Sequence, residues 1–325
     1  MPRALMLHGE SPRARLETLD ENRLPERAVR VAIDYSDLNY KDAMAVTGQG
    51  KIVRDYPLVP GIDFAGTVTA STDARFDTDD RVILTGWGVG ERYWGGFAEA
   101  MRVDADWLVP CPRPLSTREA MLFGTAGLTA MLSVMRLQEA GLSPGDGPVA
   151  VSGASGGVGS WAVSILAHEG FEVHAITGKP DQGDWLTRLG AAQVLARDDF
   201  TERGRPLAST HWAGAVDTVG GQVLANLLAQ MRYAGKVAAV GLAGDAALPT
   251  TVMPFILRGV ALLGVDSVYI PFERRRAAWQ RIAALPNALL THMQVEEIGL
   301  EDVESQAHAM IEGRTHGRLL IDPHR

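Results

Sequence analysis

The sequence predicts an α/β protein with two domains: a small, mostly β domain and a larger domain with a doubly wound parallel sheet. Three observations lead to this prediction. The chain has 325 residues, enough for about two domains. Before roughly residue 120, short β-like segments alternate with Gly, Pro and Asp turns. After it, strands alternate with helical segments, the pattern of a parallel sheet covered by helices on both faces.

The bulk composition is that of an ordinary globular protein, with 46% hydrophobic and 22% charged residues. A net charge of −8 argues against nucleic acid or an anionic membrane as the partner. The N-terminal segment lacks the apolar core of a targeting peptide, and the longest apolar stretch, 252–265, is too short to span a bilayer. We therefore expect a cytoplasmic protein with no nucleic-acid partner and no membrane partner. The single cysteine, Cys111, excludes an internal disulfide and is interpreted as an incidental loop thiol.

The first half contains four clear β segments. They are "RVAIDY" 30–35, "FAGTVTA" 64–70, "RVILTG" 81–86 and "FAEAMRV" 97–103. This spacing predicts a small, mostly antiparallel barrel or sandwich. At the other end of the chain, "GRLLID" 317–322 is a strand with no helix after it, and we expect it to return to this domain.

The second half continues as alternating strands and helices. "GPVAVSG" 147–153 is expected to form a buried strand, followed by the helix "GVGSWAVSILAHEG" 157–170. The next strand, "FEVHAIT" 171–177, precedes a helix near 182–189 that ends at Gly190. The remaining expected strands are 193–196, 214–220, 235–241 and 260–265.

A glycine-rich turn joins the first of these strands to its helix. Gly153, Gly156 and Gly159 form a G-x-x-G-x-x-G pattern rather than the commoner G-x-G-x-x-G. It could be a flexible connection, but between a strand and a helix such a turn brings a dinucleotide pyrophosphate close to the backbone and to the helix N-terminus. The predicted site comprises Gly153, Ser155, Gly156, Gly157, Val158 and Gly159.

The tip of the next strand indicates which dinucleotide is bound. An NAD site would place an Asp or Glu there for the ribose hydroxyl, whereas this chain has Thr177, Gly178 and Lys179. A hydroxyl, a small residue and an ammonium suit a 2′-phosphate, which favours NADP. Arg197 could reach the same pocket, or could form a solvated salt bridge with Asp198 or Asp199.

Several further motifs resemble a known family. They are "ENRLPE" 21–26, "NYKDA" 39–43, "PGIDFAGTV" 60–68, "GWGVGERYWGGFAE" 86–99, "GTAGLTAM" 124–131, "DTVGG" 217–221 and "LPTTVMPFILRGVALLGVDSV" 248–268. With the glycine pattern, they resemble the zinc-free quinone-oxidoreductase branch of the medium-chain dehydrogenase/reductase superfamily, and most of all its acrylyl-CoA reductase (NADPH) group. The resemblance covers the whole chain.

The resemblance implies a GroES-like domain, a Rossmann NADP-binding domain and an active site between them. We expect the first at residues 1–122, completed by 290–325, and the second at 123–289. The resemblance also implies a homodimer that pairs the Rossmann edge strand at about 260–266.

Zinc ligands are missing from the expected positions. Zinc-dependent relatives carry Gly-His-Glu where this chain has Gly61, Ile62 and Asp63, and a cysteine in the stretch that here contains Asn39 and Tyr40. Without these donors no tetrahedral zinc site remains. Reduction of an activated C=C bond then fits better than alcohol chemistry, which needs a Lewis acid for the alkoxide.

The predicted reaction is hydride transfer from NADPH to the β-carbon of an α,β-unsaturated thioester or carbonyl compound, followed by protonation of the α-carbon. Tyr40 and Asn39 are the candidate catalytic residues. Tyr40 is placed beside the cofactor by the resemblance, as a donor or as a positioner of the ring; alternatively, its hydroxyl binds a backbone carbonyl within the fold. Asp42 is expected to cap a helix or to pair with Lys41.

Further contacts follow from the resemblance. Leu242, Ile256 and Ser267 are expected at the nicotinamide and ribose end, although Ile256 could equally lie in the core. Gly124, Thr125 and Thr129 are expected near the diphosphate or the nicotinamide amide, with simple helix packing as the alternative. For Arg274, Arg275 and Arg276, a solvated helix face is preferred to a coenzyme A phosphate site.

Three functions remain open. The first is an NADPH-dependent enoyl-CoA reductase acting on short chains, above all acrylyl-CoA. The second is a quinone or alkenal reductase that is indifferent to the coenzyme A portion. The third is an NADPH-binding sensor without catalysis.

Overall fold

The computed structural model describes residues 1–9 and 13–325. The chain divides into two compact units. Unit 1 comprises residues 1–125, 267–285 and 294–325, and unit 2 comprises residues 126–266 and 286–293. The segment 267–285 differs from the expected division, because it packs in unit 1. The reason is visible in Arg275, whose fully buried guanidinium donates hydrogen bonds to Thr85 and Val268.

Unit 1 is the expected mostly β domain. Its elements are β1 (Arg3–Leu7), β2 (Ala14–Thr18), β3 (Val29–Asp37), α1 (Tyr40–Thr47), β4 (Asp63–Ser71), β5 (Arg81–Thr85), β6 (Ala100–Val103), β7 (Leu108–Pro110), α7 (Phe272–Ala283), β14 (Val295–Ile298), α9 (Val303–Ile311) and β15 (Arg318–Ile321). The main sheet runs β14-β15-β3-β4-β5-β7, with β6 paired to β3, and all its pairs except β14–β15 are antiparallel.

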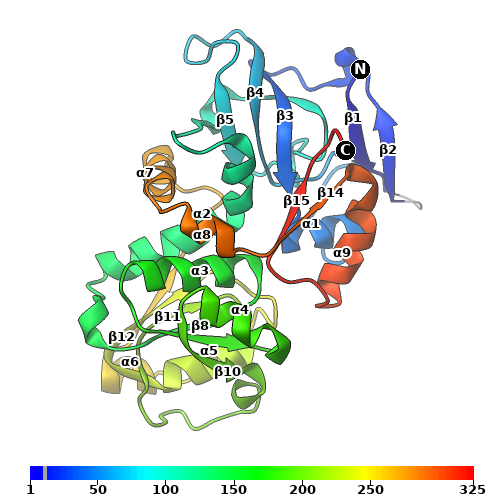
Figure 1. The fold of residues 1–325 in the computed structure, drawn as a ribbon. Helices are drawn as coiled ribbons and strands as arrows, with labels where there is room; N and C mark the ends of the chain where they lie inside the picture. The colour runs from blue at the N-terminus through cyan, green and yellow to red at the C-terminus, as the bar shows by residue number, and fades with distance from the viewer. Residues whose placement is uncertain (10–12) are drawn as a thin grey trace. The chain divides into compact units, whose positions relative to one another are not determined.

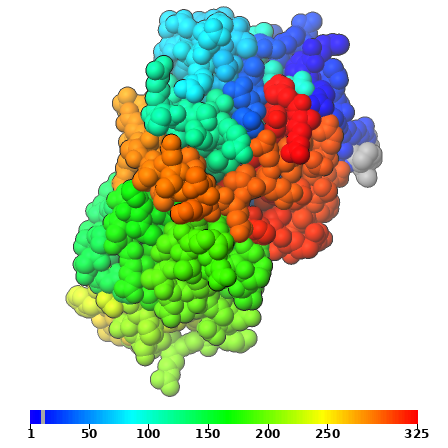
Figure 2. Space-filling model, in the orientation of Figure 1, coloured from blue at the N-terminus to red at the C-terminus, as the bar shows by residue number. Residues whose placement is uncertain are grey.

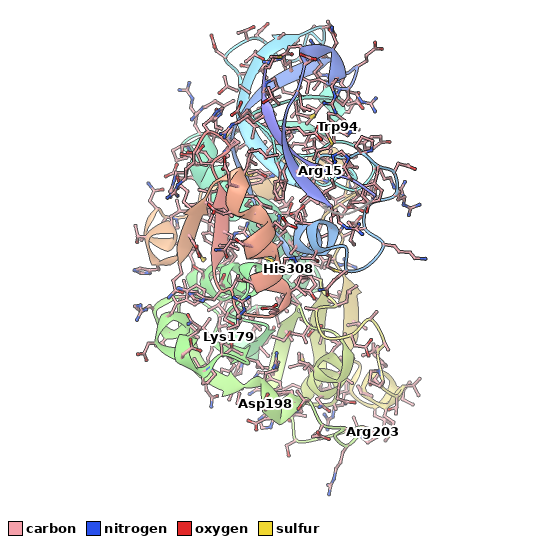
Figure 3. All side chains as sticks on the ribbon, turned by 90° about the vertical axis from the view of Figure 1, so that its right-hand side faces the viewer. Arg15, Trp94, Lys179, Asp198, Arg203 and His308 are labelled. Carbon is pink, nitrogen blue, oxygen red and sulfur yellow. The ribbon has the colours of Figure 1, made fainter. Side chains whose placement is uncertain are left out.

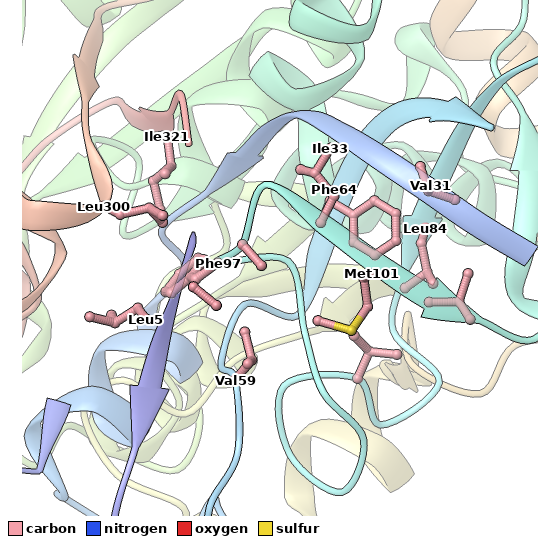
Figure 4. Close-up of a cluster of buried hydrophobic side chains, with 14 of the residues drawn as sticks. Leu5, Val31, Ile33, Val59, Phe64, Leu84, Phe97, Met101, Leu300 and Ile321 are labelled. Carbon is pink, nitrogen blue, oxygen red and sulfur yellow. The ribbon is translucent and has the colours of Figure 1, made fainter. Parts of the chain in front are cut away.

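The two ends of the chain meet in unit 1. β15 pairs with β3 as the sequence predicted, so that the last strand closes a sheet begun near the N-terminus. Arg3 donates to the carbonyl of Pro323, and the space-filling view shows red C-terminal atoms against blue N-terminal ones (Figure 2). Side chains from both ends also share one core, in which Leu5 and Ile321 lie with Phe64 and Phe97 (Figure 4).

Unit 2 is built on a six-stranded parallel sheet in the order β10-β9-β8-β11-β12-β13. Strands β8, β10, β11 and β12 are labelled in Figure 1. Its elements are β8 (Val149–Ser152), α3 (Gly157–His168), β9 (Val173–Thr177), α4 (Gly183–Arg188), β10 (Ala191–Ala196), β11 (Trp212–Asp217), α5 (Gly221–Ala229), β12 (Met231–Ala239), α6 (Met253–Arg258), β13 (Ala261–Gly264) and α8 (Ala288–His292). The strand order reverses between β8 and β11, which confirms the predicted Rossmann sheet. Ligands of such sheets bind at the carboxyl ends of the strands beside this reversal.

A long helix, α2 (Thr117–Glu139), begins in unit 1 and continues in unit 2. Its backbone breaks at Gly124, where φ is 51° and ψ is −154°. Among the described residues, α2 is the helix long and apolar enough to cross a membrane, but 89% of its most apolar window is buried inside the protein.

Candidate active site

The glycine turn lies at the carboxyl end of β8, beside the reversal of strand order. Gly153 has φ +60°, and a Cβ there would overlap the Thr218 hydroxyl and lie 3.3 Å from Val219. A Cβ at Gly159 would lie 2.7 Å from the backbone of Ala154. These contacts explain why the turn carries glycine at both positions.

Helix α3 begins directly after this turn with its first N–H groups uncapped. Gly156 is the N-cap residue, and no side chain caps the helix. The backbone N–H groups of residues 157–159 have no partner within a helix, and the helix dipole favours an anion beside them. The first turn, with Gly157 and Val158, is therefore suited to a pyrophosphate.

A buried carboxylate that the sequence analysis did not single out holds the adjacent loops. Asp217, at the end of β11, accepts hydrogen bonds from the Ser152 hydroxyl at 2.6 Å and from the Gly220 N–H at 2.8 Å. The Thr218 hydroxyl donates to the Ser152 carbonyl at 2.9 Å. Burial raises the pKa of Asp217, and the Ser152 hydrogen bond opposes that rise. The signal in the sequence was an acidic residue at the end of an otherwise apolar strand.

Two cations converge at the tip of β9. The hydroxyls of Ser155 and Thr177 lie 2.9 Å apart, and the Lys179 backbone N–H donates to the Thr177 hydroxyl at 3.1 Å. A Cβ at Gly178 would lie 2.7 Å from the Arg197 guanidinium carbon, so Arg197 lies against this turn. Partial burial lowers the pKa of Lys179, and the charge of Arg197 lowers it further, while Asp181 raises it.

This cation pair fits a 2′-phosphate. Two neighbouring positive charges repel each other, and an anion between them would relieve that repulsion. The alternative salt bridge is also present: Arg197 lies 4.0 Å from Asp198, with 48% of the arginine side chain exposed. Lys179 and Asp198 both lie on unit 2 (Figure 3). The tip thus offers hydroxyls, a backbone turn and two cations.

The remaining predicted cofactor residues are spread over both units. Thr129 is buried on α2, and Leu242 is 61% exposed in the loop after β12. Ile256 is 71% exposed on α6, so the alternative that it lies in the core is wrong. Ser267 lies in unit 1, where its carbonyl accepts a hydrogen bond from Arg275 at 3.1 Å.

In unit 1, the N-terminus of α1 is anchored in a buried carboxylate cluster. The Asn39 side-chain amide donates to Asp37 Oδ1 at 2.5 Å and to the two carboxylate oxygens of Asp63 at 3.2 and 3.3 Å. Asp42 accepts the Asn39 N–H at 3.0 Å and the Ile62 N–H at 2.9 Å. Asp42 thus caps the helix as predicted. Lys41 pairs instead with Glu91 at 2.8 Å.

The positive charge of one arginine partly compensates the negative charges of the three buried carboxylates. Arg318 of β15 forms an ion pair with Asp37 and donates to the Leu122 carbonyl. Burial raises the pKa of Asp37 well above its usual range, against the effect of Arg318, and burial also raises the pKa of Asp63. Burial and the charge of Asp63 raise the pKa of Asp42 to about 7. One cation therefore faces three buried acids, whose titrations are coupled through their short distances.

Tyr40 is the first residue of α1, and its side chain is partly exposed to solvent, whereas that of Asn39 lies in the carboxylate cluster. The Tyr40 side chain is 41% exposed. In the described part of the chain its hydroxyl has no hydrogen bond, so the alternative in which it binds a backbone carbonyl is wrong. The Asn39 amide, in contrast, is committed to Asp37 and Asp63.

The arginine run of α7 does not form one solvated face. Arg276 is exposed and pairs with Glu273, as expected for such a face. For Arg275 the prediction is wrong, because its side chain is fully buried and bound to backbone carbonyls of unit 1.

The described residues contain no group of three His, Cys, Asp or Glu side chains placed to hold a metal ion. The position that would carry a zinc-binding histidine is Ile62, which is buried.

Comparison with known proteins gives matches over most of the chain. Residues 25–113 match the alcohol dehydrogenase GroES-like domain family, and residues 157–284 match the zinc-binding dehydrogenase family. The chain is 54% identical to the probable acrylyl-CoA reductase AcuI of Escherichia coli (strain K12), over 98% of each chain. It is 53% identical to the acrylyl-CoA reductase AcuI of Ruegeria pomeroyi, over 95% of this chain and 94% of that protein.

A solved structure of a similar protein has the same fold as this chain. The YhdH oxidoreductase of Salmonella enterica in complex with NADP is 53% identical. It superposes with a TM-score of 0.96, over 98% of this chain and 99% of that one.

Proposed function

Because this chain belongs to the medium-chain dehydrogenase/reductase superfamily, in its quinone-oxidoreductase-like branch, we propose that it is an NADPH-dependent enoyl-CoA reductase. Its substrate is a short α,β-unsaturated acyl-CoA, above all acrylyl-CoA, which it converts to propionyl-CoA. The observation that carries the proposal is the convergence of Lys179 and Arg197 on the tip of β9 in a chain 54% identical to an acrylyl-CoA reductase.

The reaction consumes acrylyl-CoA, NADPH and one proton and yields propionyl-CoA and NADP⁺. When bound, the cofactor supplies the hydride for the β-carbon. Unit 2 binds it through the glycine turn, the first turn of α3, and the pair Lys179 and Arg197, which selects the 2′-phosphate. Ser155 and Thr177 hold the two loops at the correct spacing. Thr129, Leu242, Ile256 and Ser267 complete the proposed cofactor site.

Residues of unit 1 donate a hydrogen bond to the substrate carbonyl oxygen and supply the proton for the α-carbon. Hydride addition at the β-carbon leaves an enolate, whose oxygen needs hydrogen-bond donors before the α-carbon takes a proton. Tyr40 is the proposed donor because its hydroxyl is exposed and unpaired within the described chain. Asn39 acts with it by fixing the start of α1 on Asp37 and Asp63.

The direct test is NADPH oxidation with acrylyl-CoA, crotonyl-CoA and a simple quinone in parallel, with NADH as the cofactor control. We expect the highest kcat/KM with acrylyl-CoA and NADPH. Reduction of the quinone alone would favour a quinone or alkenal reductase. Cofactor binding without turnover of any of the three would favour an NADPH-binding sensor. Either result would overturn the proposal.

We also propose a cytoplasmic homodimer with no membrane or nucleic-acid partner. The net charge of −8 supports the last two points. β13 is an edge strand of the unit 2 sheet, and the neighbouring helix α6 leaves Ile256 and Leu257 71% and 56% exposed. A second copy that paired with β13 would cover both the strand edge and Leu257. Analytical ultracentrifugation of Leu257→Arg should then show monomers where the wild type sediments as a dimer.

A further inference from the structure

One aromatic residue near α1 has an unfavourable backbone conformation and an unpaired side-chain N–H group. Trp87, in the loop after β5, has φ +59°, the left-handed region that a bulky residue rarely adopts. Its indole N–H is buried and has no hydrogen-bond partner among residues 1–9 and 13–325. Both features cost free energy, and such features persist mainly where a residue serves a function.

The surroundings of Trp87 fix its ring as well as its backbone. The guanidinium carbon of the buried Arg275 lies 4.9 Å from the ring centroid, a cation–π contact. The Trp87 backbone N–H donates to the Val268 carbonyl at 3.1 Å. On either side, Gly86 and Gly88 have φ +81° and +78°, and a Cβ at Gly86 would lie 2.7 Å from the Val268 oxygen. The loop can therefore follow this path only with glycine at Gly86.

The same loop is tied to the start of α1 at two points. The Gly86 N–H donates to the Ile62 carbonyl, and the Ile62 N–H donates to Asp42 of α1. Glu91, at the end of the loop, pairs with Lys41. Trp87 is thus fixed within unit 1 relative to the helix that begins at Tyr40.

The side chains that surround the residue after Trp87 are Tyr269, Arg92 and Tyr93. A Cβ at Gly88 would lie 3.1 Å from the Tyr269 hydroxyl, and Tyr269 is 55% exposed. Trp87 itself is partly exposed. A rigid, flat aromatic ring with a partly exposed surface suits contact with a short hydrocarbon chain.

We propose that Trp87 is a specificity-determining residue that forms the wall against which the unsaturated acyl chain of the thioester packs, and that it limits the length of that chain. This inference rests on the proposed function. Acrylyl is the shortest enoyl group, and each added methylene would have to displace a ring that Arg275 and the loop backbone hold in place.

The test compares kcat/KM for acrylyl-CoA and trans-2-hexenoyl-CoA in the wild type, Trp87→Ala and a matched control, Trp107→Ala. Trp107 is a partly buried tryptophan of the same unit that also lies under an arginine, with Arg27 5.4 Å from its ring. We expect Trp87→Ala to raise the ratio of hexenoyl to acrylyl turnover about tenfold or more, and Trp107→Ala to leave it unchanged.

A hexenoyl-to-acrylyl ratio that changes less than about twofold in an active Trp87→Ala protein would overturn the inference. If Trp87→Ala is inactive, calorimetric affinities of Trp87→Phe and Trp87→Ala for hexanoyl-CoA and propionyl-CoA decide the same point. If the ratio of hexanoyl-CoA affinity to propionyl-CoA affinity is the same in both variants and in the wild type, the inference is again refuted. Failure of the proposed function itself is distinguishable, since the wild type would then reduce neither thioester.

Discussion

Replacing Gly124 by alanine tests whether the break in α2 is required by the carboxylate cluster. At φ 51° and ψ −154°, Gly124 occupies a region essentially restricted to glycine. A Cβ there would lie 3.0 Å from both the Arg318 guanidinium and the Asp37 carboxyl carbon, and closer still to one carboxylate oxygen. The methyl group and the Asp37–Arg318 ion pair cannot occupy the same space.

Two costs add in this variant. The backbone conformation costs an alanine about 1–3 kcal/mol. Displacing Asp37 from Arg318 leaves buried charge uncompensated, which costs about 3–5 kcal/mol. The expected loss is therefore about 4–8 kcal/mol, a large share of the roughly 5–15 kcal/mol by which typical proteins are stable.

The assay is urea-induced unfolding followed by circular dichroism, with Gly313→Ala as the control. Gly313 lies in the same unit with φ +71°, but a Cβ there would meet no atom within 4 Å. The control should lose only about 1 kcal/mol. If Gly124→Ala unfolds within about 1 kcal/mol of Gly313→Ala, the clash with the ion pair is not what requires glycine, and the reasoning fails.

Three further predictions concern charge and proton transfer. Because the pKa of Asp42 rises from 3.8 unfolded to about 7 folded, stability should fall as pH rises from about 4 to 7, by on the order of 4 kcal/mol for this group. Asp42→Asn should flatten that slope in unfolding measured from pH 4 to 8, and parallel curves would contradict the pKa assignment. Lys179→Ala and Arg197→Ala should each weaken NADPH binding about tenfold but leave NADH binding unchanged in fluorescence titrations; an equal loss for both cofactors would exclude 2′-phosphate recognition. Tyr40→Phe should lower kcat about 100-fold with little change in KM, and an unchanged kcat would remove Tyr40 as the proton donor.

Much of the fold follows from local sequence patterns. The alternation of apolar strands with amphipathic helices predicts the parallel sheet, and the glycine turn predicts the point at which β8 passes into α3. These features depend on neighbours in the chain. The position of Lys179 at the tip of β9 is predictable for the same reason, since it follows the strand directly.

The carboxylate cluster could not be predicted in this way. Asp37 and Arg318 are separated by 281 positions, and no local pattern links an acid at the end of one strand to a base at the start of another. The burial of Arg275 could not be predicted for the same reason, because it depends on residues distant in the sequence. A run of three arginines with helical neighbours usually faces solvent, and only the tertiary fold brings the Thr85 and Val268 carbonyls to the guanidinium of Arg275.

The pairing of β15 with β3 has a consequence for synthesis of the chain. Arg318, which compensates the charge of Asp37, is translated long after β3, β4, β5 and β7 of the same sheet. The main segment of unit 2, 126–266, is also complete well before that point. On the ribosome, the Rossmann sheet can therefore fold while the β domain still awaits β15, and the residues around Tyr40 gain their final arrangement only once Arg318 has emerged. A nascent chain that stops before β15 would carry a finished glycine turn after β8 and an incompletely packed start of α1.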